Sequence, residues 1–221
     1  MTECVEQLDF GFLLGKQICA RFDGGELSSD GGMMLLAEAD QRLGLTSALA
    51  ACVPDPRDQS QVQHKWHTLF AQRSYQIACG YEDADDADDL RGDWAFKTAL
   101  ERRPDTDPDL ASQPTFSRFE NCVSRTSLRR MAEVFIDQFV RRYVNRRECR
   151  IILDFDATDD PAHGQQQFVE FHGHYKEYCY LPLIVTAQVD DGPQELLVAM
   201  LRPGNVDAAA YAVAILKRLV P

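Results

Sequence analysis

The chain has 221 residues, of which 45% are hydrophobic and 26% charged, as expected for a globular protein of one or two domains. It contains no apolar run near the roughly 20 residues that cross a membrane, and its first residues lack the pattern of a secretory signal. Seven cysteines are scattered without a CxxC pair, which indicates reduced thiols and a cytoplasmic location rather than a disulfide framework.

The net charge of −12 argues against nucleic-acid binding by the chain as a whole, but the charges are unevenly distributed. Residues 1–110 carry a net charge of −11, and residues 151–221 carry −6. Residues 111–150 carry +5, from nine arginines and four acidic residues. This arginine-rich block can follow a line of phosphates, although the field of the whole chain opposes the approach.

Apolar patches separated by glycines predict an N-terminal arm with one or two short strands in residues 1–30. Glycines at 44 and 80 stand where the helices that precede them are expected to end. Together these patterns predict a helical region over residues 31–148. Its helices are predicted over residues 33–43, 46–52, 57–79, 86–101, 112–119 and 127–145.

The stretch RIILDFDATDD, residues 150–160, joins three aliphatic residues to four carboxylates. This pattern predicts a buried strand whose tip emerges into solvent. Asp154 and Asp156 then share one face, with Phe155 on the other. Two close carboxylates repel each other, and a divalent cation such as Mg²⁺ or Mn²⁺ relieves that repulsion. The alternative is a strand end followed by an Asp-rich turn with no metal.

Downstream of this stretch, the pattern predicts strands over 180–189 and 195–201 and a helix over 208–220. Glycines at 164 and 173 indicate loops or a hairpin before the first of these strands. With the strand at 151, residues 149–221 are therefore expected to hold three strands and one helix.

Zinc sites are a minor alternative, because structural zinc prefers four nitrogen or sulfur ligands. Two sets of candidate ligands are His64 with His67, and His163 with His172, His174 and Cys179. The acidic residues between 81 and 93 do not fit a calcium-binding EF-hand, which needs glycine and glutamate at fixed positions.

The predicted helix at 112–119 has two interpretations. Ser112 and Pro114 suit the start of an ordinary capped helix. Alternatively, it is the second helix of a helix-turn-helix motif that contacts DNA. The side chains that would then face DNA are Gln113, Thr115, Ser117 and Arg118. The following helix adds Arg129 and Arg130, while its apolar stripe belongs to the core.

Six stretches, in one order along nearly the whole chain, resemble the DDE transposases of a bacterial insertion-sequence family. They are SSDGG (28–32), QIACGYEDADDADDLR (76–91), LASQPTFSRFEN (110–121), LDFDATDDPAHG (153–164), YCYLPL (178–183) and LRPGNVD (201–207).

The resemblance implies an α+β/α/β fold: a helical DNA-binding region followed by the first half of a ribonuclease-H-like catalytic domain at 149–221. In the family, three carboxylates hold two Mg²⁺ or Mn²⁺ ions for DNA cleavage and strand transfer. Asp156 in Asp-Ala-Thr matches the first of them, with Asp154 as the alternative or a supporting residue. The helical region, including Gln113–Arg118 with Arg129 and Arg130, would bind the terminal inverted repeats.

The family's second and third carboxylates have no recognisable counterpart. We therefore expect an N-terminal fragment that is inactive alone and associates with itself or with a full-length transposase. One alternative is a regulator that occupies the terminal repeats without cutting them. Another is a small metal-dependent hydrolase that combines Asp154 and Asp156 with His163 or His172.

Overall fold

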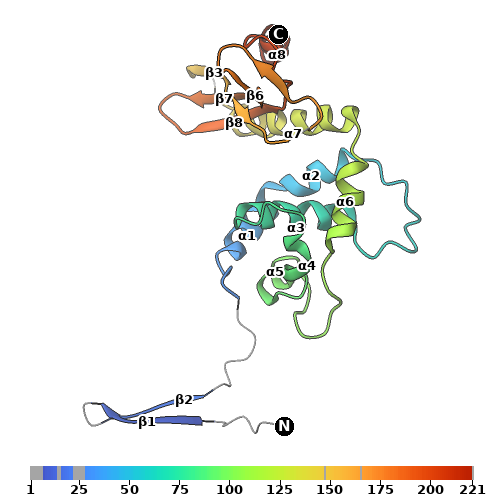
Figure 1. The fold of residues 1–221 in the computed structure, drawn as a ribbon. Coiled ribbons are helices and arrows are strands. Elements are labelled where there is room, and N and C mark those ends of the chain that lie inside the picture. The colour runs from blue at the N-terminus through green and yellow to red at the C-terminus, as the bar shows by residue number, and fades with distance from the viewer. Residues whose placement is uncertain (1–6, 14–15, 22–27, 147, 165, 221) are drawn as a thin grey trace. The chain divides into compact units, whose positions relative to one another are not determined.

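The structure is a computed structural model that describes residues 7–13, 16–21, 28–146, 148–164 and 166–220. Contacts divide the chain into two compact units, residues 1–123 and 124–221 (Figure 1). The first unit contains a hairpin and a set of helices, and the second combines antiparallel strands with helices. The predicted mixture of α and β structure is thereby confirmed.

The N-terminal strands β1 (Gln7–Leu13) and β2 (Lys16–Arg21) pair antiparallel. Gln7 lies opposite Arg21, and the register shifts between Asp9 and Phe12. The short strands predicted for the N-terminal arm are confirmed. Residues 1–6, 14–15 and 22–27 of that arm lie outside the described residues.

The first unit continues with six helices among the described residues, where the sequence predicts five. They are α1 (Met33–Leu43), α2 (Leu45–Ala51), α3 (Trp66–Ala78), α4 (Asp86–Leu90), α5 (Trp94–Ala99) and α6 (Gln113–Asn121). Gly44 ends α1 with a φ of 64°, a conformation that costs glycine little, and its N–H donates to the Asp40 carbonyl.

Two predicted helices are wrong in extent. The helix expected over 57–79 begins only at Trp66, because carboxylates form local turns before it. The Asp55 side chain accepts the Arg57 N–H, and the Asp58 side chain accepts the Ser60 N–H. The helix expected over 86–101 is broken at residues 91–93. There the Asp93 side chain accepts the Phe96 N–H and caps the start of α5.

Helix α3 lies at the centre of the first unit, because it contributes to two apolar clusters. Its Ala71 and Tyr75 pack with Met33 of α1 and Phe96 of α5. Its fully buried Leu69 packs in a second cluster with residues of α4 and α6. Those partners are Ala87, Phe116 and Phe119.

The buried Gln72 ties α3 to the segment that leads into α6. Its amide oxygen accepts the Ala111 N–H at 3.0 Å, and its amide nitrogen donates to the Ala111 carbonyl at 2.9 Å. This reciprocal pair satisfies buried polar groups on both segments and thereby fixes where α6 begins.

The main sheet of the second unit has the strand order β3-β7-β8, all antiparallel. Its strands are β3 (Ile151–Ala157), β7 (Leu183–Val189) and β8 (Gln194–Met200). Helices α7 (Arg125–Tyr143) and α8 (Ala212–Leu219) cover one face of this sheet. α7 contributes Ile136 and Phe139 to the shared core, and α8 contributes Ile215 and Leu219.

This packing places α7 in the second unit, whereas the predicted helical region extends to residue 148. The helix is joined to β8 by its own side chains, since Arg142 and Tyr143 both bond the Glu195 carboxylate. The division of the chain into three domains otherwise stays a prediction.

A smaller sheet, in the order β4-β6-β5, lies between β3 and β7 in the sequence. It comprises β4 (Asp160–Pro161), β5 (Glu170–His172) and β6 (Glu177–Tyr180), and it includes the expected hairpin. The strand predicted over 180–189 is interrupted at Leu181, whose N–H donates to the Arg202 carbonyl instead of continuing a ladder. The last helix begins at Ala212 rather than 208, because Tyr211 has a φ of 69°.

Candidate active site

Asp154 and Asp156 both project from the exposed face of β3, as the alternation of the strand predicts. Leu153, Phe155 and Ala157 point the other way, into the core beneath α7 and α8. The burial of these apolar side chains fixes the register, and the register forces the two carboxylates into solvent.

The prediction that this strand is buried is wrong. β3 pairs only with β7 among the described strands, and it is therefore an edge strand. Ile151 and Ile152 at its start are 48% and 44% exposed. Across the ladder, Asp154 lies opposite Thr186 and Asp156 lies opposite Ile184.

The other two carboxylates of the stretch leave the strand. The Thr158 N–H donates to the Pro182 carbonyl, and Asp160 pairs with Tyr180 in the smaller sheet. The predicted geometry is therefore confirmed, because Asp154 and Asp156 lie on one strand face and Asp159 and Asp160 follow where the chain leaves the strand. The choice between a metal site and a turn without metal stays a prediction.

The alternative zinc and hydrolase sites are not formed. Within the described ranges, no three His, Cys, Asp or Glu side chains lie close enough together to hold a metal ion. The ring of His172 accepts the N–H groups of His174 and Tyr175 at its Nδ1. The ring of His64 contacts Arg102, and burial, followed by the charges of Arg102 and Arg57, lowers its pKa.

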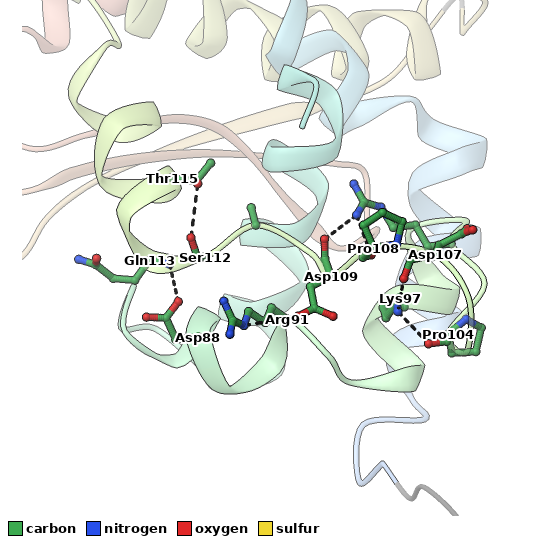
Figure 2. Close-up of polar contacts among 12 residues, drawn as sticks. Asp88, Arg91, Lys97, Pro104, Asp107, Pro108, Asp109, Ser112, Gln113 and Thr115 are labelled. Carbon is green, nitrogen blue, oxygen red and sulfur yellow. Dashed lines mark hydrogen bonds and ion pairs between the residues drawn. The ribbon is translucent and has the colours of Figure 1, made fainter. Parts of the chain in front are cut away.

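The predicted DNA-contacting side chains of α6 are less exposed than expected. Arg118 is exposed, whereas Gln113, Thr115 and Ser117 are half-buried. Figure 2 shows the start of this helix, where the Gln113 N–H donates to the Asp88 carboxylate at 3.1 Å. The first turn of α6 thus already has an acidic partner, and Arg118 is the exposed one of the four predicted DNA-contacting side chains.

Three of the nine arginines of the arginine-rich block form ion pairs within the second unit itself. Arg142, Arg146 and Arg150 form ion pairs with Glu195, Asp190 and Asp191. Arg129 and Arg130, on the first half of α7, are exposed. They share this exposure with Arg125 and Arg141, and the position of all four on the surface of α7 is compatible with the predicted role in DNA binding.

One feature of the first unit has no counterpart in the sequence prediction. The Arg57 guanidinium lies 3.6 Å from the centre of the Trp66 ring, beside Thr115 and Arg118 of α6. No periodic signal connects residues 57, 66 and 118, because the contact is made between a loop and a distant helix.

The chain matches the family described as transposase DDE domain, group 1, over residues 10–221, and it belongs to that family. No match was found among curated proteins, and none among solved structures. In the part of the chain that the structure describes, no helix is long and apolar enough to cross a membrane. The resemblance to DDE transposases is thereby confirmed.

Proposed function

We propose that this chain acts in the transposition of an insertion sequence, with Asp156 as the first catalytic carboxylate and Asp154 beside it. The observation that carries the proposal is the pair of exposed carboxylates on the first strand of an antiparallel sheet, in a member of a DDE transposase family. We further propose that β3, β7 and β8 are the first strands of a ribonuclease-H-like domain.

The donor set suits the divalent ion that the family generally uses. Asp154 and Asp156 offer hard oxygen donors in solvent, and Mg²⁺ commonly takes one or two carboxylates together with water and phosphate oxygens. When bound, such an ion lowers the barrier to attack on a phosphodiester by stabilising negative charge on oxygen. The two carboxylates would hold the ion, and the rigid strand would fix their spacing at the scissile phosphate.

The proposed partner is the DNA of the terminal inverted repeats, bound in the cytoplasm at the nucleoid. Arg118 supports this role in the first unit, and Arg129 and Arg130 support it in the second, because all three are exposed. Further contacts to the DNA would then come from the exposed parts of the half-buried side chains Gln113, Thr115 and Ser117. Self-association, or association with a full-length transposase, belongs to the same proposal.

Purified chain incubated with terminal-repeat DNA and Mn²⁺ tests the catalytic assignment. We expect the chain alone to be inactive, so the assay is run with and without a full-length transposase. Any metal-dependent nicking that requires the chain should be abolished by Asp156→Ala and reduced by about tenfold to a hundredfold by Asp154→Ala, as for a supporting metal ligand. Asp191→Ala, on the exposed turn after β7, is the control. Nicking that survives Asp156→Ala would refute the assignment.

A regulator that binds the repeats without cutting them is the second candidate. It is favoured by the ligand count, because Asp154 and Asp156 have no third ligand nearby within the described residues. Tight binding to repeat DNA without any nicking, unchanged by Asp156→Ala, would favour this candidate.

A further inference from the structure

A cavity of about 500 Å³ lies in the first unit between the segment 56–66 and α6. Its lining includes Arg57, Gln61, His64, Trp66 and Arg118. The volume falls within the roughly 300–1,000 Å³ typical of sites for small organic ligands, and it is far larger than a phosphate alone requires.

The floor of the cavity is formed by three planar groups in contact. Phe119 of α6 packs against the Trp66 ring with centroids 5.1 Å apart, and the Arg57 guanidinium lies over the same indole at 3.6 Å. Cation–π contacts of this kind are favourable because the ring face is electron-rich. Arg57 therefore covers one face of the Trp66 ring, and Phe119 contacts the same ring at an interplanar angle of 47°.

The guanidinium is held rigidly in its plane. It donates two hydrogen bonds of 2.7 Å to Asp55, through Nε and Nη2, and one of 3.1 Å from Nη1 to the His64 carbonyl. The hydrogen bond from Arg57 is the main reason that the pKa of Asp55 falls to about 2, so the pair is ionised at neutral pH. Because Asp55 compensates its charge, Arg57 is better suited to stacking than to binding a phosphate.

The remaining lining holds several hydrogen-bond donors and one carboxylate, that of Asp58, which already accepts from the N–H and the hydroxyl of Ser60. The Trp66 Nε1–H is buried with no acceptor among the described residues. Arginine can only donate, so its 3.2 Å contact makes the His64 Nδ1 an acceptor and leaves the proton of the neutral ring on Nε2. Arg118 is exposed and lies 3.4 Å from the Thr115 hydroxyl. Such a site suits a ligand with acceptor atoms and one negative charge.

We propose that this cavity binds one unpaired nucleotide of DNA, with its base stacked on Arg57 and its phosphate at Arg118. A base within a duplex cannot reach the site, because both its faces are stacked and its pairing edge is occupied. An unpaired base offers a free face to the guanidinium and free acceptors to the donors around it. The inference rests on the DNA-binding function proposed above.

Trp66 itself can report the binding. The chain has two tryptophans, and Trp94→Phe on α5 would leave Trp66, directly beneath Arg57, as the single one. The probes are deoxyadenosine monophosphate, a duplex with one unpaired adenine, and the same duplex fully paired. We expect the nucleotide to quench Trp66 and the unpaired duplex to bind about tenfold more tightly than the paired one.

Arg57→Lys keeps the positive charge but removes the planar guanidinium. It should abolish both the quenching of Trp66 and the tenfold preference for the duplex with the unpaired adenine. Arg103→Lys changes an arginine whose side chain is 81% exposed, and it should keep both. Because Arg57→Lys also disturbs Asp55, Arg118→Ala provides a second variant on an exposed side chain. It should weaken binding of the nucleotide but not of deoxyadenosine, which lacks the phosphate.

Equal binding of the two duplexes overturns the proposal while leaving DNA binding itself intact. Retention of the preference in folded Arg57→Lys overturns it as well. If neither duplex binds, the proposed DNA-binding function fails, and quenching by the nucleotide alone then decides whether the cavity is a nucleotide site.

Discussion

Among the described glycines, Gly204 has the closest backbone neighbours, because the chain passes against two backbone carbonyls there. A Cβ atom at this position would lie 2.2 Å from the Cys179 oxygen and 2.5 Å from the Glu170 oxygen. The neighbouring Arg202 is 1% exposed, and its Nε donates to the Leu181 carbonyl at 2.7 Å. Together they fasten the segment after β8 to the smaller sheet that follows the candidate active site.

Gly204→Ala should therefore destabilise the second unit by about 3 kcal/mol, the upper end of the usual cost of overpacking, since backbone atoms cannot move aside like a side chain. Urea unfolding followed by circular dichroism measures the change. Gly173→Ala is the matched control, because a Cβ there meets nothing within 4 Å. Equal stability of the two variants would contradict the close approach.

The stretch LRPGNVD (201–207) shows which properties of single residues the sequence can predict. Its turn was predictable from Pro203 and Gly204, whose backbone preferences are local. The burial of Arg202 was not, because its hydrogen-bond partners, including the carbonyls of Ala208 and Ala210, are brought together only by the fold.

At the scale of elements, the segment before α3 is held by charge rather than by apolar packing. Folding lowers the pKa of Asp55 to about 2 from an ordinary value of 3.8, chiefly through its hydrogen bond from Arg57. The folded state therefore binds this proton less readily than the unfolded state does. The resulting stabilisation is complete above about pH 4 and is lost as the pH falls toward 2.

We predict that Asp55→Asn lowers the thermal midpoint at pH 7 and that its difference from the unsubstituted chain shrinks steadily between pH 4 and pH 2. Scanning calorimetry across that range provides the measurement. Asp89→Asn removes an exposed carboxylate of α4 and serves as the control for the change in net charge. A difference that stays constant down to pH 2 would rule out this ion pair as the source of the stabilisation.

Elements defined by periodicity were predictable, and those defined by distant contacts were not. The alternation in β3 correctly predicts that Asp154 and Asp156 share a face, since the core beneath Phe155 enforces the same period of two. The start of α3 and the break at Leu181 depend on hydrogen bonds to Asp55, Asp58 and Arg202 that carry no periodic signal. The cavity beside Arg57 escapes prediction for the same reason.

At the scale of the whole molecule, a chain of net charge −12 must approach a polyanion through a minority of its surface. The arginine-rich block meets this requirement only in part. Arg142 of α7 and Arg146, which follows the helix, are paired with carboxylates of their own unit, whereas Arg129 and Arg130 are exposed. Paired arginines are partly neutralised, so they should release few counterions from DNA.

Salt dependence separates these two kinds of arginine. We predict that the double variant Arg129→Ala/Arg130→Ala reduces the slope of log K against log salt for terminal-repeat DNA by about 2, roughly 0.9 for each lost phosphate contact. Arg142→Ala/Arg146→Ala removes the same charge from the end of α7 and the residues just after it, and it should change the slope little. The fold should persist, because exposed ion pairs contribute about 0–1 kcal/mol to stability. Fluorescence anisotropy between 50 and 200 mM salt is the measurement, within the range where such slopes are large. Equal changes in the two variants would show that net charge, rather than contact at Arg129 and Arg130, governs the approach to DNA.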